Sequence, residues 1–367
     1  MLAAGQAIFA PKRSRWTFRG RDVLILTFIL ISILGVLELS AVPPSKWRVL
    51  GSTTYTPEQQ QQPAKVPSIQ SSILLKEATP EDSRIAKVSI MYGDAKPEYE
   101  QALATHKHHN RLHGYKMLIQ REPMLEGYWT KPAFLMSIVL QELRKPQHER
   151  LQWLFWVDAD TIILNYEMPI EAFLPPWQDN DLKDISIVVT NDFNGFNNGV
   201  FAVKVDVLAA ELFAGILAFR DFEPETYLQW HDQSAMHNVL KQRKFAKHTV
   251  YVPQRWFNAY KPDEGGELKE DHVRPGDFLV HFAGVADREP VMREWLTLSE
   301  KRLPEWNVRL SATDYPAEIE RFWAKFKEEK AVRDKEEEEE LKRKEQDKKK
   351  QEEEDQKNKD KEEKKSQ

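Results

Sequence analysis

The chain has 367 residues, of which 30% are charged and 41% hydrophobic, and its formal net charge is -5 at pH 7. This charge gives no basis for binding nucleic acid, and the absence of cysteine excludes disulfides, cysteine-based zinc sites and thiol catalysis. The length allows one large domain or two small ones.

The first segment with a clear pattern is an apolar run near the N-terminus. Residues 23–37 are uncharged and almost wholly apolar, and with Glu38 near its edge the run reaches Val42, about the length that crosses a bilayer. Five basic residues precede the run and two prolines follow it. We therefore expect a cytosolic basic segment over residues 1–22, an uncleaved signal anchor over residues 23–42, and the rest of the chain across the membrane. A cleaved signal peptide is the competing interpretation.

The next segments predict a flexible stem followed by a globular domain. Residues 43–84 are rich in Gln, Pro, Ser and Thr and have no apolar period, which is typical of a stem. Apolar periodicity then predicts a domain over residues 85–326. Its expected elements are a strand from Ile85 to Gly93, a helix from Tyr99 to Leu112, a strand from Tyr115 to Gln120, a helix from Trp129 to Leu143 and a strand that begins at Leu151. This alternation is typical of a doubly wound α/β sheet, in which ligands bind beyond the carboxyl ends of the strands.

The most informative segment is LQWLFWVDADTIILN, residues 151–165. An aromatic, apolar run ends in Asp158 and Asp160, and a second apolar run follows directly. Two carboxylates at the end of a buried strand are unfavourable unless a positive charge compensates them. The usual compensation is a hard divalent cation shared with phosphate oxygens, which indicates nucleotide-sugar chemistry. An Asp-x-Asp pair can also simply cap the next turn.

Three further segments carry polar residues suited to a sugar site. NDFNGFNNGVFAV places Asn197 and Asn198, which can bond sugar hydroxyls, beside Gly199, where the backbone can approach a ligand closely. A plain hairpin turn is the simpler interpretation of this segment. In WHDQSAMHNVL, Asp232 is either a helix N-cap or a carboxylate beside the anomeric carbon of the transferred sugar. In LVHFAG, His281 is either a core residue or a third ligand of the cation.

Four histidines, His106, His108, His109 and His113, lie in the first predicted helix of the domain. Only His109 and His113 share a helical face, and no carboxylate is placed to complete a set of metal ligands. We therefore expect a solvated helix face rather than a second metal site.

The C-terminal part is nearly pure Glu, Lys, Asp, Arg and Gln, with almost balanced charge. Leu341 is nearly the only apolar residue after Val332, which excludes the heptad seam of a coiled coil. Residues 327–367 are therefore expected to form a charged low-complexity tail, either a single helix with i,i+4 ion pairs or a disordered segment. A solvated tail without chemistry is the simpler interpretation, and a tether for partner proteins is the other.

Taken together, these segments resemble glycosyltransferase family 34, which contains fungal Golgi galactosyl- and mannosyltransferases and the related plant xyloglucan xylosyltransferases. The resemblance covers roughly Ile85 to Trp323, through WLFWVDADTIILN, FNNGVFAVK, HDQSAMHNVL, VPQRWFNAY and GDFLVHFAG, in that order. It implies a GT-A fold, a nucleotide-sugar donor (UDP-galactose or GDP-mannose), a divalent cation, usually Mn²⁺, and retention of the anomeric configuration.

The resemblance also implies roles for individual residues. Asp158, Asp160 and His281 take the positions of the metal-binding residues, and Asp232 and Gln233 those of a catalytic pair near the transferred sugar. The residues expected to bind donor or acceptor are Asn197, Asn198, Gly199, Asn258 and Tyr260. The chain departs from the family at His231, where an acidic residue is common, and at Val285, where cysteine is common.

The implied function is that of a type II Golgi membrane protein with a lumenal catalytic domain, which elaborates protein glycans. It would transfer galactose or mannose to a mannose-containing glycan, as an α-1,2-galactosyl- or α-1,6-mannosyltransferase. The implied partners are the membrane, a glycan or glycoprotein acceptor and a glycosyltransferase complex. The alternative is a non-catalytic scaffold subunit of a Golgi mannosyltransferase complex. A metal-dependent phosphohydrolase would share the aspartates but would not call for the anchor, the stem and the Asn/Gly loop together.

Overall fold

The computed structural model describes residues 83–94, 96–263 and 265–366. The expected cytosolic segment, the signal anchor and nearly all of the stem lie outside the described residues. Among the helices that are described, none combines the length and the apolar character needed to cross a membrane.

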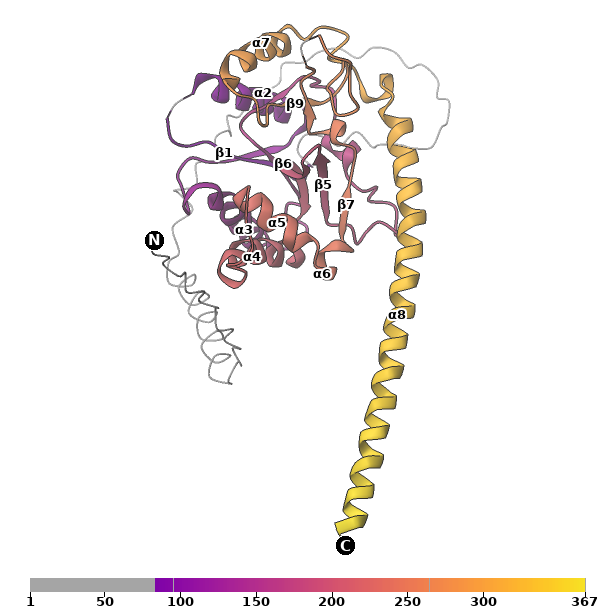
Figure 1. Ribbon diagram of the computed structural model, residues 1–367. Coiled ribbons are helices and arrows are strands. Elements are labelled where there is room, and N and C mark those ends of the chain that lie inside the picture. Colours follow the sequence, from indigo (N-terminus) through magenta and orange to yellow (C-terminus); the bar gives the residue numbers. More distant parts are fainter. Residues whose placement is uncertain (1–82, 95, 264, 367) are drawn as a thin grey trace, which may run out of the picture. The chain divides into compact units, whose positions relative to one another are not determined.

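A six-stranded mixed sheet forms the centre of the described domain (Figure 1). Its strands stand in the order β2-β1-β3-β6-β5-β7, and β6 runs antiparallel to both of its neighbours while the other adjacent pairs are parallel. The strands are β1 (Ile85–Ile90), β2 (Lys116–Gln120), β3 (Trp153–Val157), β5 (Ile187–Asp192), β6 (Gly195–Lys204) and β7 (Thr249–Tyr251). The α/β class expected from the sequence is confirmed.

Helices cover both faces of this sheet, with α3, α4 and α5 on one face and α2 and α7 on the other side (Figure 1). The helices are α2 (Pro97–His113), α3 (Thr130–Leu143), α4 (Val207–Phe222), α5 (His231–Leu240), α6 (Arg243–Ala246), α7 (Arg288–Lys301) and α8 (Tyr315–Ser366). Short 3-10 helices span Gly127–Trp129, Ile170–Phe173, Gln254–Trp256 and Leu310–Ala312. The expected helices before and after the second strand agree with α2 and α3.

The packing around strand β3 explains why its sequence is apolar throughout rather than alternating between apolar and polar residues. Leu154 and Trp156 belong to the hydrophobic cluster that contains residues of α3 and α4, whereas Phe155 and Val157 belong to the cluster on the opposite face. Successive side chains of a strand point to opposite faces, so a strand covered on both sides needs apolar residues at every position. The buried strand therefore ends directly before Asp158.

A second sheet of three short strands lies beside the end of β3. Its strands, in the order β4-β9-β8, are β4 (Thr161–Ile163), β9 (Leu279–His281) and β8 (Ala259–Tyr260). β4 and β9 are antiparallel, and their register places Thr161 opposite His281. This pairing brings a histidine from far along the sequence next to the loop that carries the two aspartates.

The histidines of α2 do not form the expected solvated face. His106 and His109 are fully buried, and His108 and His113 are only partly exposed. Lys87 of β1 contacts both buried imidazoles, and His106 also bonds to Thr161 of β4. The helix is therefore covered by β1 on one side and by β4 and α7 on another. Helical periodicity in the sequence does not reveal such covering on two sides, so that expectation was wrong.

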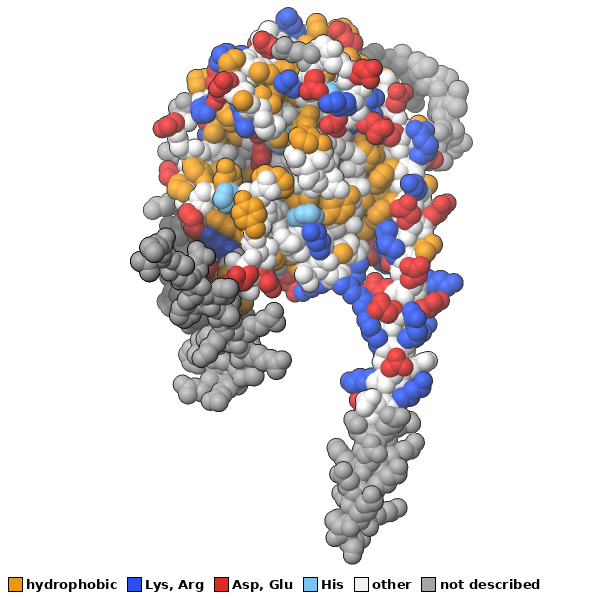
Figure 2. Space-filling model, viewed as in Figure 1, with side chains coloured by type: hydrophobic (Ala, Val, Ile, Leu, Met, Phe, Trp, Pro, Cys, Tyr) orange, Lys and Arg blue, Asp and Glu red, His pale blue; other side chains and the backbone are white. Residues whose placement is uncertain are grey.

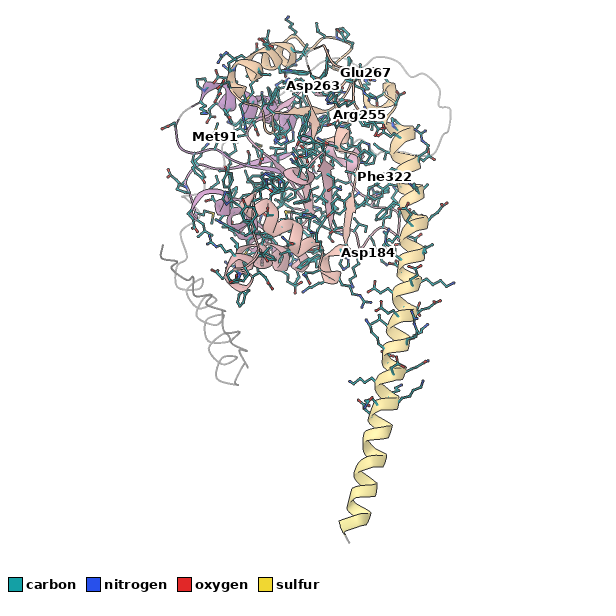
Figure 3. The ribbon with its side chains drawn as sticks, viewed as in Figure 1. Met91, Asp184, Arg255, Asp263, Glu267 and Phe322 are labelled. Carbon is teal, nitrogen blue, oxygen red and sulfur yellow. The ribbon has the colours of Figure 1, made fainter. Side chains whose placement is uncertain are left out.

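The charged tail is part of one long helix, α8, which spans 52 residues. Its beginning belongs to the domain, because Tyr315 and Trp323 are buried in the core and Arg255 pairs with Glu318. Figure 3 shows Arg255 and Phe322 where this helix meets the domain. The boundary between core and tail is therefore a gradual loss of apolar contacts within one helix.

Further along α8, contacts with the domain are ionic. They join the helix to the domain surface through the pairs Lys327–Asp179, Lys327–Asp181, Lys330–Asp184 and Glu337–Arg243. Beyond these, i,i+4 pairs such as Glu338–Lys342 and Glu340–Lys344 lie within the helix, and side chains of both charges alternate over its surface (Figure 2). Exposed pairs of this kind each contribute little to stability, so many of them are needed to support the helix.

Candidate metal and sugar site

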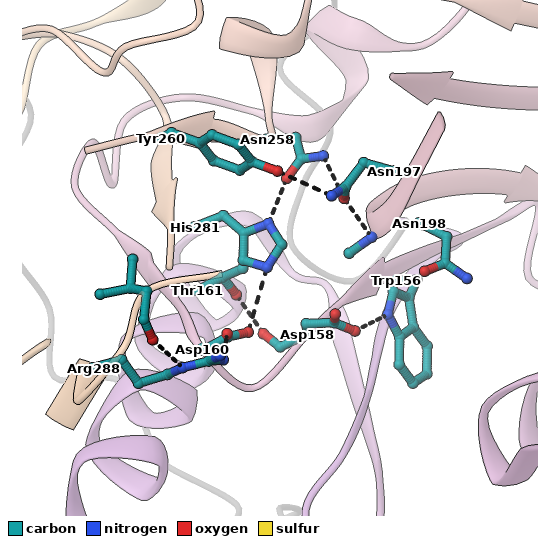
Figure 4. Close-up of polar contacts among 12 residues, drawn as sticks. Trp156, Asp158, Asp160, Thr161, Asn197, Asn198, Asn258, Tyr260, His281 and Arg288 are labelled. Carbon is teal, nitrogen blue, oxygen red and sulfur yellow. Dashed lines mark hydrogen bonds and ion pairs between the residues drawn. The ribbon is translucent and has the colours of Figure 1, made fainter. Parts of the chain in front are cut away.

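The two aspartates of the Asp-x-Asp segment lie in the short loop between β3 and β4 (Figure 4). The loop is held from both sides. The Thr161 hydroxyl donates to the carbonyl oxygen of Asp158 at 2.7 Å, and the Asp158 N–H donates to the carbonyl oxygen of Gly199 at 2.8 Å. The backbone of the loop is thus pinned by β4 on one side and by β6 on the other.

Asp158, Asp160 and His281 converge, as expected from the sequence. Atoms able to bind a metal, one from each side chain, all lie within 4.8 Å of one another. Asp160 and His281 are 6% and 3% exposed, whereas Asp158 is partly exposed. Two carboxylates and an imidazole form a donor set that suits a divalent cation such as Mn²⁺. Three protein ligands would leave coordination positions of the cation for other ligands.

The hydrogen bonds of His281 determine which of its nitrogens faces the aspartates. Its Nδ1 lies 2.7 Å from Oδ1 of Asn258, whose amide nitrogen donates to Thr190 and to Asn197. Since Oδ1 can only accept, the Nδ1–H of His281 donates to it. Its Nε2 then faces Oδ1 of Asp160, 3.4 Å away, where the nitrogen can either donate to the carboxylate as part of an imidazolium or bind a cation shared with the carboxylate.

Asp160 is also paired with Arg288, at the start of α7, whose guanidinium donates to Oδ2. Burial raises the pKa of the Asp160 carboxyl, but His281 and Arg288 together outweigh burial and lower the pKa to about 2. The carboxylate is therefore ionised at neutral pH. The sequence offers no signal for Arg288, because it follows a turn and lies in a helix with many charged residues.

Lys131, on α3, connects the aspartate loop with β6. Its Nζ lies 3.1 Å from Oδ1 of Asp158, 2.6 Å from the carbonyl oxygen of Asn198 and 3.1 Å from Oδ1 of Asn198. It also lies 4.7 Å from the ring centre of Trp156, whose Nε1–H donates to Oδ1 of Asp158 at 2.7 Å. The sequence contained a weak signal for this residue, since Lys131 interrupts the apolar start of its helix.

Asp232 and Gln233 adjoin the metal cluster through Asn198. The amide of Asn198 donates to Oδ2 of Asp232 at 2.9 Å, and its backbone N–H donates to Oε1 of Gln233 at 3.1 Å. Asp232 does not cap helix α5, because the N-cap position is Trp230 and no side chain caps it. The N-cap interpretation is therefore wrong: the carboxylate turns toward β6. Burial raises the pKa of Asp232, an effect that Lys131 and Asn198 only partly offset.

The residue before Asp232 has an unusual backbone. His231 has φ of 46°, in the left-handed region that few non-glycine residues adopt. Its exposed ring stacks on Tyr128 with the ring centres 4.8 Å apart and the planes at 11°. Tyr128 is itself 65% exposed and lies one helical turn before Lys131. The stacked pair therefore forms a flat aromatic surface beside two residues of the candidate site.

Asn197, Asn258 and Tyr260 form a second polar network beside His281 (Figure 4), and Asp192 bonds to two members of this network. Asn197 donates to Oδ2 of Asp192 at 2.9 Å and to the Tyr260 hydroxyl at 3.0 Å, and that hydroxyl donates to the same carboxylate at 2.6 Å. Burial and the nearby Asp192 raise the pKa of Tyr260. These groups bond to one another and to His281, so the network supports the candidate metal ligand. Asp192 carried no signal in the sequence beyond its place before a turn.

Gly199 lies where β6 passes closest to His281. A Cβ atom on this residue would lie 2.2 Å from Cε1 of His281 and 3.0 Å from both Nδ1 of His281 and Oδ1 of Asn197. The hairpin interpretation also holds, since β5 and β6 form a hairpin whose turn lies at residues 193–194. The segment NDFNGFNNGV therefore combines a turn with a strand that contributes Asn197, Asn198 and Gly199 to the site.

The sequence matches one family over most of this domain. The sequence profile of the galactosyl transferase GMA12/MNN10 family matches residues 89–289, more than half of the chain. An α-1,2-galactosyltransferase of Schizosaccharomyces pombe is 24% identical over 175 residues, which cover 40% of this chain and 44% of that protein. The probable α-1,6-mannosyltransferase MNN10 of Saccharomyces cerevisiae is 23% identical over 247 residues, which cover 55% and 60%. The chain thus spans about half the length of the curated relatives it matches.

Among solved structures, the chain is similar to a glycosyltransferase involved in the glycosylation of the major capsid of PBCV-1. The TM-score is 0.43 and the sequence identity 16%, over 57% of this chain and 98% of that one. This structural likeness is too weak to assign the fold or the chemistry.

Proposed function

Because the chain belongs to the galactosyl transferase GMA12/MNN10 family, we propose that it is a metal-dependent hexosyltransferase that retains the anomeric configuration of the transferred sugar. The donor is UDP-galactose or GDP-mannose, and the acceptor is a mannose-containing glycan. The convergence of Asp158, Asp160 and His281 beside Asp232 carries this proposal. The names of the relatives, α-1,2-galactosyltransferase and probable α-1,6-mannosyltransferase, support both sugars and both linkages.

The proposed setting is the Golgi membrane, with a single-pass type II topology and a lumenal catalytic domain. Its support is the apolar run at residues 23–42 with basic residues before it. A glycosyltransferase complex is the proposed partner, and a glycoprotein the proposed acceptor.

A divalent cation held by Asp158, Asp160 and His281 would neutralise the negative charge that develops on the leaving diphosphate. The chain's own residues prepare that site. Arg288 keeps Asp160 ionised, and Lys131 orients Asp158 through a contact of 3.1 Å. Because these contacts exist before ligands bind, little reorganisation is needed when the reaction begins.

In this proposal, Asp232 acts on the sugar rather than on the diphosphate. The amide nitrogen of Asn198 donates to its carboxylate at 2.9 Å, and Lys131 donates to the amide oxygen of the same asparagine. A fixed carboxylate next to the anomeric carbon stabilises the positive charge that develops there as the glycosidic bond loosens. Gln233, which bonds to the backbone of Asn198, fixes the start of α5 beside this group.

We place the acceptor on the aromatic surface formed by Tyr128 and His231. Exposed aromatic rings offer a flat apolar face with polar edges, which suits the apolar face of a sugar ring. The surface adjoins Asp232 through the chain itself, since His231 is its neighbour.

The test is sugar transfer by the purified full-length chain. UDP-galactose and GDP-mannose would be supplied in parallel with a mannoside acceptor and Mn²⁺, with and without a chelator. Asp160→Asn should abolish transfer, whereas Asp263→Asn, which removes an exposed carboxylate paired with Lys269, should not. Transfer from one donor that is lost on chelation and in Asp160→Asn would establish the activity and identify the sugar. A folded chain that binds neither Mn²⁺ nor nucleotide would refute the proposal in favour of the scaffold alternative.

A further inference from the structure

Behind the candidate metal site, a lysine is buried without any carboxylate partner among the described residues. Lys87, in β1, is 0% exposed, as are His106 and His109 of α2. Its Nζ lies 2.9 Å from Nδ1 of His109 and 3.4 Å from Nδ1 of His106. Lysine is almost never fully buried unless it is paired, so this arrangement calls for an explanation.

The partners of the two imidazoles determine where their protons lie. Nε2 of His109 is 2.8 Å from the carbonyl oxygen of Met168, which can only accept, so Nε2 carries the proton and Nδ1 accepts from Lys87. Burial lowers the pKa of Lys87 and of both histidines, and the lysine lowers the histidine values further. The imidazoles are therefore neutral, and each presents an Nδ1 lone pair to the lysine.

The second imidazole points toward the aspartate loop. Nε2 of His106 lies 2.9 Å from the Thr161 hydroxyl and 3.2 Å from the Thr161 carbonyl oxygen. That hydroxyl donates its own proton to the carbonyl oxygen of Asp158, so it must accept from the Nε2–H of His106. Thr161 also stands opposite His281 in the pairing of β4 with β9. Thr161 thus bonds to Asp158 through its hydroxyl, follows Asp160 directly in the sequence and is the register partner of His281.

We propose that Lys87 is a positioning residue for the candidate metal site, which acts by holding His106 in the tautomer that donates to Thr161. Without the lysine, His106 can move its proton to Nδ1, and the Thr161 hydroxyl loses its donor. The β3–β4 loop is then free to shift the carboxylates of Asp158 and Asp160. This inference rests on the metal site of the proposed function.

The structure supplies its own control, because Lys87 bonds to two histidines and only one of them bonds to a residue of the aspartate loop's hydrogen-bond network. His106 leads to Thr161, whereas His109 leads to the carbonyl oxygen of Met168, away from the aspartates. Both imidazoles are equally buried. A loss of general stability should follow from changing either one, and a loss of metal affinity from changing only His106.

The experiment measures the Kd of Mn²⁺ for the full-length chain by electron paramagnetic resonance, together with thermal unfolding. Lys87→Met and His106→Leu should each weaken Mn²⁺ binding about tenfold, as loss of an outer-shell partner does in metal sites. His106→Gln should restore most of the affinity, since its amide can accept from Lys87 and donate to Thr161. His109→Leu should lower the unfolding temperature but leave the Kd unchanged.

The double variant Lys87→Met/His106→Leu should bind Mn²⁺ no more weakly than either single variant, because both changes break the same chain of hydrogen bonds. Additive losses, an unchanged Kd in Lys87→Met, or an equal loss in His109→Leu would overturn the inference. A wild-type chain that binds no Mn²⁺ would overturn it together with its premise. A chain that binds Mn²⁺ as expected but transfers no sugar would count against the proposed function alone.

Discussion

Replacing Gly199 by alanine should disable the candidate metal site through one added methyl group. The new Cβ would lie 2.2 Å from Cε1 of His281, and ordinary van der Waals contact begins at 3.4 Å, so the ring would have to move by about 1.2 Å. The ring has little freedom to move, because its Nδ1–H donates to Asn258 at 2.7 Å and the side chain is buried. The strand has little freedom either, since the Gly199 carbonyl accepts from the Asp158 N–H.

The expected magnitudes follow from this geometry. Overpacking a buried position typically costs about 1–3 kcal/mol, which for a domain of this size lowers the unfolding temperature by roughly 2–12 °C. A displaced His281 no longer faces Asp160 at 3.4 Å, so Mn²⁺ affinity should fall by at least about tenfold, the lower end of the effect of disturbing a metal ligand's support. The loss of affinity should therefore exceed what the loss of stability alone explains at assay temperature.

The assay is Mn²⁺ binding and thermal unfolding of Gly199→Ala beside Gly215→Ala. Gly215 lies in helix α4, where an added Cβ meets only Val239 at 3.4 Å. Since alanine is favoured over glycine inside a helix by about 1 kcal/mol, Gly215→Ala should unfold at the same or a higher temperature and bind Mn²⁺ normally. Wild-type Mn²⁺ affinity in Gly199→Ala would refute the reasoning that places His281 against β6.

Three further predictions concern the charges and rings of the site. Lys131→Met should lower kcat by about a hundredfold with the fold intact, because it removes the fixed positive charge of the lysine between Asp158 and Asn198. Steady-state kinetics would measure kcat, and circular dichroism would show whether the fold is intact. Tyr128→Ala should raise the acceptor KM by roughly tenfold, about 1.4 kcal/mol, whereas its rate of donor hydrolysis should stay near that of the wild type. The variant Tyr128→Phe should keep a KM near the wild-type value. An unchanged KM in Tyr128→Ala would exclude the aromatic surface as the acceptor site. In metal-free protein, the pKa of Asp160 lies below its usual value of 3.8, so its ionised form stabilises the fold above about pH 4, and that contribution of about 2 kcal/mol is lost as the pH falls toward 2. Urea unfolding should therefore show Asp160→Asn less stable than wild type at neutral pH, with a difference that shrinks below about pH 4; a constant difference would contradict this.

The sequence predicted the parts of the fold that depend on local pattern. The strand before Asp158 is recognisable because burial on both faces requires apolar residues at every position, and the helices α2 and α3 are recognisable from their length and period. Local patterns offered His281, Asp232 and Asn198 as candidates beside simpler interpretations, and the family resemblance favoured the functional interpretation of each. The expectation of an N-cap at Asp232 failed because a carboxylate in the first turn of a helix can either cap it or turn to a neighbouring strand.

The histidines of α2 show the limit of periodicity most clearly. Their spacing gives the face on which each residue lies, but whether that face meets water depends on what packs against it, and here β1 supplies a lysine. The same holds for Arg288, whose contact with Asp160 joins two residues 128 positions apart in the sequence.

The sequence by itself determined which chemistry is available: two carboxylates at a strand end, an imidazole in a short strand, amides beside a glycine, and a family to which these belong. Only the tertiary structure decided which groups meet and in what state, because contacts among β3, β4, β6 and β9 depend on sheet order and register rather than on spacing along the chain. Burial then sets protonation, since a charge or a lone pair inside the domain must be satisfied by whatever neighbour the fold provides. For this reason Lys87, Lys131 and Arg288, which carry no motif, are as informative about the site as the aspartates that do.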